Sequence, residues 1–231
     1  MARSVMNERN LLGKIDNGFM INMKWAFQDR EYLYLVMDQL TGGDLDTHMQ
    51  KHKFTEKQAQ FCLACLILAL EYLREKKIIH RDIKPQNIVF DDKGYLRLTD
   101  MGIAKPFKQN NSGDTSGTAL YMAPEVPIGW SLEAADFINK LLQRKPKDRL
   151  GYYHIDQIKL HPWFNKFDWD KLQKKLLKPS YVPKVNKQQE TQNNEDQSTQ
   201  LQDQISALNS DILDNPKLQQ QFAGYEYYGF K

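Results

Sequence analysis

The stretch IIHRDIKPQNIVF (78–90) places charged and amide side chains between two apolar segments, and its polar core holds His80, Arg81, Asp82, Lys84 and Asn87. Charge that is removed from water without a partner costs several kcal/mol, so a buried helix or strand would not tolerate this set. A freely solvated loop would tolerate it, but would not need apolar residues on both sides. The pattern therefore predicts a rigid loop between buried segments, with its polar groups directed at a ligand.

A second acidic position follows in LTDMGIAK (98–105), where Asp100 lies between an apolar strand and a glycine. Phosphoryl transfer needs an acid that accepts a hydroxyl proton, a cation that neutralises charge on the phosphate, and oxygen ligands for Mg²⁺. Asp82 suits the first task and Lys84 the second. The amide of Asn87 and the carboxylate of Asp100 suit the third. Together these residues predict magnesium-dependent phosphoryl transfer.

Composition limits the class of protein. The chain of 231 residues has the apolar and charged fractions of an ordinary soluble globular protein. Its net charge of +3 and pI of about 8.6 are too mild to indicate a nucleic-acid partner. The longest apolar run (61–73) carries Glu71 and is too short for a membrane span, and the N-terminus lacks the apolar stretch of a signal peptide. With only two cysteines, we expect a cytoplasmic or nuclear protein in a reducing compartment.

Sequence periodicity predicts the elements that position the polar loop. A long helix over 54–77 begins with a capping-box pattern at Thr55 and Gln58, and a hairpin over 87–100 turns at the residues DDKG. The remaining predicted elements are a helix that breaks near Gly13, two strands within 22–40, a short helix after Gly43, and helices within 131–150 and 154–164. A segment rich in Gln and Asn (186–215) is expected to be disordered, because it can bury too little apolar surface to offset its ordering entropy.

Three motifs in a fixed order carry a resemblance to a known family. HRDIKPQN (80–87), TDMG (99–102) and YMAPE (121–125) resemble the catalytic loop, the metal-binding motif and the end of the activation segment of eukaryotic protein kinases. Lys84 resembles the lysine that marks the Ser/Thr class. The resemblance implies ATP and Mg²⁺ as cofactors and proteins with Ser or Thr as substrates. It also implies an α+β fold, partial and two-lobed, with a mainly helical large lobe.

The resemblance assigns roles to individual residues. Asp82 would be the catalytic base, Lys84 the phosphate contact, and Thr118 would help to hold both of them. The metal ligands would be Asn87 and Asp100. The implied cofactor-binding residues are Glu8, which normally pairs with the ATP lysine, Met37 as gatekeeper, Asp38 and Leu40 with their backbones facing adenine, and Asp44, together with Lys84, Asn87 and Asp100. Asp44 is also implied to attract basic residues of substrates.

Two C-terminal segments resemble the tail of AGC-type kinases. LKPSYVPKV (177–185) resembles the start of that tail, and QFAGYEY (221–227) its hydrophobic motif, with Phe222 and Tyr225 as the aromatic residues. In that group the tail docks on the small lobe, against the helix that carries the equivalent of Glu8. Burial of two aromatic side chains would hold this helix in place.

Fixed carboxylates occupy both positions that AGC kinases phosphorylate, namely Asp114 and Glu226. A carboxylate supplies about one negative charge, against roughly 1.5–2 for a phosphate, and Asp114 could pair with Arg81. We therefore hypothesise activation without an upstream kinase. The alternative is that Thr115 or Thr118 is the phosphorylation site and Asp114 an ordinary acidic loop residue.

Some of the family pattern is not found. No glycine-rich loop or lysine strand precedes Glu8, and after APEVPIGW (123–130) the sequence proceeds directly to SLEAADFINKLL. We expect an internal deletion near 130/131, which would leave the helix at 56–75 without its main partner. The predicted domains are a partial small lobe and hinge (1–40), a partial large lobe (41–165), and an AGC-like tail (166–231) with its hydrophobic motif at 222–227. A Ser/Thr kinase is the leading interpretation, and the alternatives are a pseudokinase that acts as a regulatory binding module or a non-functional splice product.

Some residues have a structural interpretation beside a functional one. Cys62 and Cys65 form a C-x-x-C on an apolar helix without a second pair, which favours a buried structural role over a metal or redox role. His80 within HRD favours packing and backbone hydrogen bonding over a role as general base. Trp25 and Tyr34 are predicted to be core residues of their strands.

Overall fold

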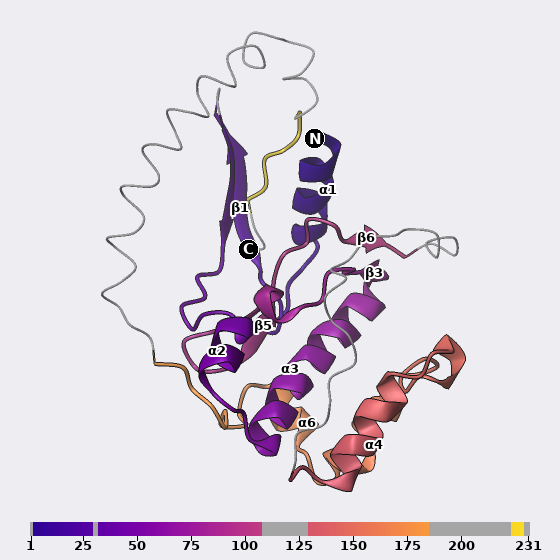
Figure 1. The fold of residues 1–231 in the computed structure, drawn as a ribbon. Helices are drawn as coiled ribbons and strands as arrows, with labels where there is room; N and C mark the ends of the chain where they lie inside the picture. Colours follow the sequence, from indigo (N-terminus) through magenta and orange to yellow (C-terminus); the bar gives the residue numbers. More distant parts are fainter. Residues whose placement is uncertain (1, 30–31, 108–128, 185–222, 229–231) are drawn as a thin grey trace.

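A computed structural model gives the fold over residues 2–29, 32–107, 129–184 and 223–228 (Figure 1). The predictions that concern Asp114, Thr118, Phe222, the YMAPE motif and the Gln-rich segment lie outside the residues that the structure describes. Within these residues helices and short antiparallel strand pairs are combined, so the predicted α+β class is confirmed. None of the helices is long and apolar enough to cross a bilayer in the part of the chain described.

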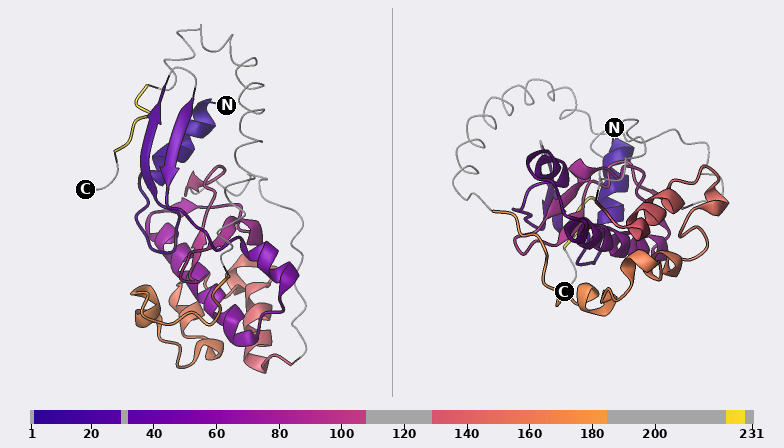
Figure 2. Two further views of the ribbon diagram at one scale, coloured as in Figure 1. Left: turned by 90° about the vertical axis from the view of Figure 1, so that its left-hand side faces the viewer. Right: turned by 60° about the horizontal axis from the view of Figure 1, so that its bottom comes forward.

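The smaller part of the molecule contains α1 (Ala2–Leu12), β1 (Met23–Gln28) and β2 (Leu33–Met37). The strands pair antiparallel, with Ala26 opposite Leu35, and α1 lies beside them in both side views (Figures 1 and 2). The helix ends just before Gly13, as predicted. Met23 and Ala26 on β1 are buried.

The prediction that Trp25 and Tyr34 are core residues is wrong. Trp25 is 52% and Tyr34 36% exposed. A register shift between Met23 and Trp25 interrupts the alternation on β1, so the buried positions are Met23 and Ala26. In a two-stranded sheet with a helix beside one face, large side chains on the other face remain in solvent.

The larger part begins with α2 (Leu45–Lys51) and α3 (Glu56–Glu75). The predicted capping box is present at the start of α3, where Thr55 and Gln58 each bond the other's backbone. Beyond α3, β3 (Ile78–Ile79) pairs with β6 (Lys105–Pro106), and β4 (Ile88–Phe90) pairs with β5 (Leu96–Leu98) as the predicted hairpin. The polar loop lies between β3 and β4.

The C-terminal arm contains α4 (Leu132–Leu141), α5 (Asp156–Lys159) and α6 (Trp169–Gln173). The predicted helices in this region are shorter than expected, because Pro146 and Pro162 each begin a separate 3₁₀ turn. Glu56 at the start of α3 attaches the arm: its carboxylate accepts hydrogen bonds from Ser131 N at 2.9 Å and from Trp163 Nε1 at 2.8 Å.

Helix α3 is the centre of the core, and its two sides differ. Its buried residues are Phe61, Cys62, Ala64, Cys65, Ile67, Leu68, Ala69 and Leu73. Leu63, Leu66 and Leu70 follow one another at helical spacing and are only half-buried. An open groove of about 1120 Å³ borders this side, lined by Leu70, Ile78, Ile79, Phe107 and Tyr152 among others.

Candidate active site

The polar loop brings an acid, a cation and an amide into direct contact. Lys84 Nζ lies 2.7 Å from Asp82 Oδ2. Asn87 Nδ2 donates to the backbone oxygen of Asp82 at 2.9 Å and to its Oδ2 at 3.0 Å. A 3₁₀ turn, Pro85–Asn87, fixes the loop between these residues, with Pro85 at its first position. The loop is therefore held in one conformation, with the predicted groups together.

The loop is anchored on the strand before Asp100. Thr99 donates from its backbone N at 2.8 Å and from Oγ1 at 3.1 Å to the carbonyl oxygen of Asn87. On the other side, His80 Nε2 donates to Thr99 O at 2.9 Å. These bonds place Asp100 directly beside the loop of Asp82 and Asn87.

His80 is 2% exposed, and both ring nitrogens have partners, since Nδ1 accepts from the backbone N of Asp82 at 3.3 Å. Burial lowers the pKa of His80, against an opposing effect of its bond to Thr99. A neutral imidazole that bonds two backbone groups fits the structural interpretation of this histidine. Arg81 adopts a positive φ of 71° and its Nε donates to Ile103 O at 2.7 Å. Arg81 thereby joins the loop to the segment after Asp100.

Asp100 also has a positive φ, of 61°, a conformation that Asp tolerates better than most residues. Its Oδ1 accepts from the backbone N of Gly102 at 3.0 Å. A Cβ at Gly102 would lie 3.1 Å from Asp100 Oδ1 and 3.9 Å from Glu8 Oε2, so both carboxylates border this glycine. Burial and the neighbouring Asp100 raise the pKa of Glu8.

One pocket of about 290 Å³ connects residues that are far apart in sequence. From the predicted cofactor-binding set it is lined by Glu8 on α1, Met37 at the end of β2, Asp38 and Leu40 after it, and Asp100. Apolar walls are added by Leu12, Ile21, Val89 and Met101. A pocket with apolar walls and acidic groups at one end suits a base with an attached phosphate chain.

The donor set fits ATP and Mg²⁺. Among the residues that the structure describes, no three His, Cys, Asp or Glu side chains gather to hold a metal ion unaided. Mg²⁺ bound with a nucleotide keeps waters and phosphate oxygens and needs only one or two protein ligands. Asn87 and Asp100 would hold it. The amide nitrogen of Asn87 bonds Asp82, which leaves the amide oxygen as the atom of this side chain that can take a metal ion. The backbone N of Asp38 donates to Asn22 O at 2.9 Å, so Asp38 offers a base its carbonyl.

Three of the predicted cofactor-binding residues, Asp44, Lys84 and Asn87, are not among those that line the pocket. Lys84 and Asn87 belong to the polar loop, whereas Asp44 precedes α2. It caps α2: its carboxylate accepts from Thr47 N at 2.8 Å and from Thr47 Oγ1 at 2.7 Å. Burial alone would raise the pKa of Asp44, but the bonds from Thr47 hold it below its usual value. An acidic residue directly before a helix is a sequence signal for an N-cap, and Asp44 has this position before α2.

The C-terminal residues contact α1 and β1. Tyr225 is 1% exposed, and Arg9 Nε donates to its carbonyl oxygen at 2.8 Å. Tyr227 pairs with Ala26 through two backbone bonds of 2.8 and 2.9 Å. Gln28 Nε2 donates to the carboxylate of Glu226 at 3.0 Å. Burial and the charge of Glu8 raise the pKa of Tyr225.

The two cysteines are buried within α3. Cys62 is 7% exposed and Cys65 is fully buried. Burial raises the pKa of Cys65 to about 12 and also raises that of Cys62. Thiols in this state are poor metal ligands and poor nucleophiles, which fits the structural interpretation.

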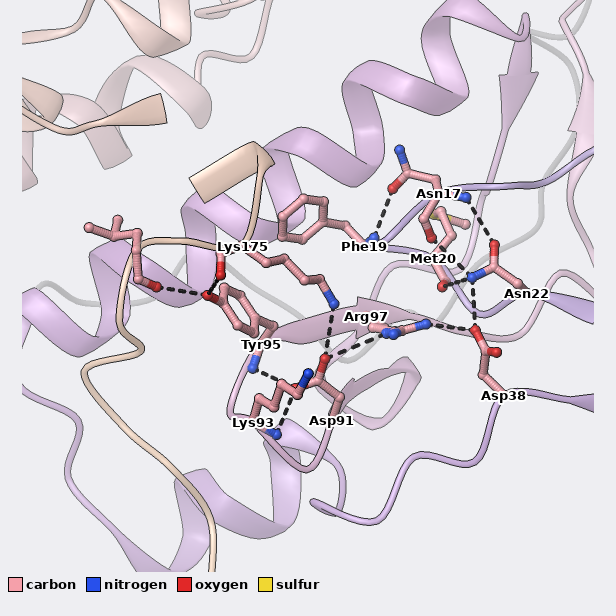
Figure 3. A network of polar contacts seen from close by, with 11 residues as sticks. Asn17, Phe19, Met20, Asn22, Asp38, Asp91, Lys93, Tyr95, Arg97 and Lys175 are labelled. Atoms are coloured by element: carbon pink, nitrogen blue, oxygen red, sulfur yellow. Dashed lines mark hydrogen bonds and ion pairs between the residues drawn. The ribbon is translucent and has the colours of Figure 1, made fainter. Parts of the chain in front are cut away.

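Sequence reasoning missed a buried polar network behind the pocket. Its members are Asn22, Asp38, Asp91, Arg97 and Lys175, shown in Figure 3. The sequence held one signal, the placing of Arg97 between two buried leucines of β5. It held no signal for the partners, because Arg97 lies 59 residues from Asp38 along the chain.

Comparison with known proteins agrees with this geometry. The protein kinase domain family matches residues 1–129. A probable serine/threonine-protein kinase of Dictyostelium discoideum is 36% identical over 235 aligned positions, which cover 78% of this chain and 52% of the relative. The serine/threonine-protein kinase sgk-1 of Caenorhabditis elegans is 32% identical, with 90% of this chain and 56% of the relative covered. Ribosomal protein S6 kinase alpha-2 of Mus musculus is 33% identical, with 82% of this chain and 33% of the relative covered. The chain spans about half the length of the first two relatives.

Proposed function

This chain belongs to the protein kinase family and to its AGC type, and from that premise we propose that it binds ATP with Mg²⁺ and transfers the γ-phosphate to Ser or Thr hydroxyls of proteins. The observation that carries the proposal is the pocket shared by Glu8, Met37, Asp38, Leu40 and Asp100. Its lining combines an apolar site for adenine with a carboxylate beside the catalytic loop.

The residues of the loop divide the chemistry between them. Asp82, held by Asn87, accepts the proton of the substrate hydroxyl. Lys84 lies 2.7 Å from Asp82 Oδ2, so its ammonium group is placed to contact the phosphate beside the attacking oxygen. Asn87 and Asp100 would hold Mg²⁺, which would supply neutralisation of the phosphate charge.

The tail is proposed to position α1, and through it Glu8. This is supported by the burial of Tyr225 and by the bond of Arg9 on α1 to the carbonyl oxygen of Tyr225. Glu226 is proposed to replace a phosphorylated residue, supported by its bond from Gln28. The corresponding proposal for Asp114 and Arg81 rests on sequence alone.

We also propose that a segment is missing inside the large lobe, near Trp130 and Ser131. The alignment with sgk-1 has 260 positions but covers 90% of 231 residues, which is about 208, so about 50 positions of the relative lack a counterpart here. The alignment with the Dictyostelium RAC family homologue has 274 positions and covers 96% of this chain, which is about 222 residues. Again about 50 positions of the relative lack a counterpart here. The open groove beside α3 supports the same proposal.

The groove and this gap favour a second candidate function, a regulatory binding module that retains nucleotide binding without phosphoryl transfer. The two candidates make different predictions for the same protein. A kinase transfers phosphate from ATP·Mg²⁺ to a Ser-containing basic peptide. A binding module binds ATP·Mg²⁺ and transfers none.

The test measures transfer of labelled γ-phosphate by the chain and by a completed variant. The completed variant carries the 50 or so additional positions of a relative between Trp130 and Ser131, and the glycine-rich loop and lysine strand of the same relative before Glu8. We expect the completed variant to be active and its Asp82→Asn form to lose at least about a hundredfold in rate. Asp92→Asn, at an exposed acid in the β4–β5 turn, is the matched control and should keep full activity. An active Asp82→Asn form, or an inactive completed variant that still binds ATP, would contradict the proposed transferase.

A further inference from the structure

A row of charged side chains runs from the nucleotide pocket to the beginning of the tail (Figure 3). Arg97 Nη1 lies 2.6 Å from Asp38 Oδ2, and Lys175 Nζ lies 3.0 Å from Asp91 Oδ2. Arg97 Nε lies 3.7 Å from the same Asp91 oxygen. Acids and cations therefore alternate along the row, with Arg97 between two carboxylates and Asp91 between two cations.

These groups are largely withdrawn from water. The side chains of Asp38, Arg97, Asp91 and Lys175 are 17%, 18%, 6% and 24% exposed. Ion pairs in such surroundings are weakly screened, and removal of one partner leaves an uncompensated charge that seeks a new one. A change at one end of the row is thus expected to shift the remaining charged side chains of the row.

One nitrogen of Arg97 lacks a hydrogen bond among the described residues, and its surroundings indicate the direction in which Arg97 can move. Its Nε is buried and, within the described part of the chain, has no hydrogen-bond partner. The carboxylate oxygen 3.7 Å away, Asp91 Oδ2, already accepts from Lys175. Lys175 and Arg97 therefore share one carboxylate oxygen, and Lys175 is the nearer cation. Loss of Lys175 would leave the charge of Asp91 less compensated and would draw Arg97 toward it.

At the other end, Arg97 is one of three side chains that hold Asp38, since Lys24 Nζ lies 3.1 Å from Asp38 Oδ1. Asp38 Oδ2 also accepts from Asn22 Nδ2 at 2.8 Å, and the backbone N of Asp38 donates to Asn22 O. Because Asp38 lines the nucleotide pocket, its backbone position affects the contacts available to a base. Arg97 reaches this residue from β5 in the other part of the molecule.

Lys175 lies at the start of the tail and is held there by Tyr95 and Phe19. Its backbone oxygen accepts from Tyr95 Oη at 2.6 Å, and the same hydroxyl lies 2.9 Å from Leu177 O. Its ammonium group lies 5.0 Å from the centre of the Tyr95 ring and 5.6 Å from that of Phe19. Displacement of the segment after α6 would therefore withdraw Lys175 from Asp91.

We propose that Arg97 is a positioning residue for the nucleotide site and that Lys175 sets its position, so that the start of the tail controls nucleotide affinity. When Lys175 leaves Asp91, Arg97 Nε closes on the freed oxygen, and Arg97 loosens its contact with Asp38. The inference rests on the proposed binding of ATP at this pocket, and it adds the means by which the tail regulates that site.

The test compares ATP·Mg²⁺ affinity, by calorimetric titration, among Lys175→Met, Lys174→Met and Lys175→Met combined with Asp91→Asn. Lys174 is exposed on the same turn, so its substitution matches the loss of charge without touching Asp91. We expect Lys175→Met to raise the Kd about fivefold, at the low end of coupling between sites, and Lys174→Met to leave it unchanged. The Asp91→Asn addition removes the competing carboxylate and should restore affinity.

A readout without nucleotide separates this inference from the proposed function. In Lys175→Met, the Arg97 Nε–H resonance should shift and exchange more slowly with water, because it gains an acceptor, while the Asp38 amide should exchange faster. If the wild-type chain fails to bind ATP but these changes occur, the proposed function fails and the coupling stands. An unchanged Arg97 Nε–H signal, or a double variant as weak as Lys175→Met alone, would overturn the coupling.

Discussion

The two sides of α3 differ in how fully the described residues cover them. On one side Cys65 and Leu68 are buried, and the polar loop that precedes β4 has its polar groups paired. On the other side Leu66 and Leu70 are half-buried, and Leu70 lines the open groove. A helix that is apolar on every side is normally buried on every side. The groups proposed to carry chemistry are thus paired, whereas, within the residues that the structure describes, the side of α3 that borders the groove is incompletely covered.

The largest expected effect tests this contrast with a matched pair on α3. Leu68→Ala removes methyl groups from the closed side and should lower the free energy of unfolding by about 2–5 kcal/mol. Leu70→Ala borders the groove, where solvent can fill the space, and should cost about 1 kcal/mol or less. Urea unfolding of both variants measures the difference. Equal losses would show that the groove side is as fully packed as the other.

A second prediction concerns the C-terminal contact with α1. Tyr225→Ala empties a fully buried site and should cost about 2–4 kcal/mol in the stability of α1, since the loss of a buried aromatic side chain costs about 3–5 kcal/mol in a core. Amide exchange over α1 measures this, and Tyr228→Ala, at a residue 80% exposed, is the control. Unchanged exchange in α1 after Tyr225→Ala would show that the contact does not stabilise the helix.

Attachment of the arm gives a smaller expected effect. Glu56 accepts from Ser131 and Trp163, and hydrogen bonds to a charged group are worth about 1.5–3 kcal/mol. Glu56→Gln keeps the shape and one acceptor, so it should cost about 1–2 kcal/mol. Tryptophan fluorescence during unfolding reports this change through Trp163. A variant as stable as the wild type would mean that the packing of Phe137 and Trp163 alone holds the arm.

The smallest expected effect is a pH dependence from His80. Its pKa is lowered in the folded state, chiefly by burial, so below about pH 6.5 the unfolded chain binds a proton that the folded chain does not. Stability should therefore fall as the pH drops from 6.5 toward 5. Urea midpoints at several pH values should show this slope in the wild type and less of it in His80→Phe. An identical slope in both proteins would assign the effect to other groups.

Features that depend on residues close together in the chain could be predicted from the sequence. The capping box at Thr55 and Gln58, the hairpin around its DDKG turn, and the grouping of Asp82, Lys84 and Asn87 depend on neighbours within a few residues. The row from Asp38 to Lys175 joins three segments far apart in sequence, and no local pattern marks it. The exposure of Trp25 followed from a bulge in β1, which residue types alone do not disclose.

The most direct test of the nucleotide site is calorimetric titration of the purified chain with ATP, with and without Mg²⁺, beside the variant Asp100→Asn. We predict saturable binding by the wild type that weakens by an order of magnitude or more when Mg²⁺ is omitted or Asp100 is replaced, since both changes remove charge compensation at the phosphates. Binding that is absent in the wild type, or that is unaffected by both changes, would contradict the assignment of this pocket to ATP and Mg²⁺.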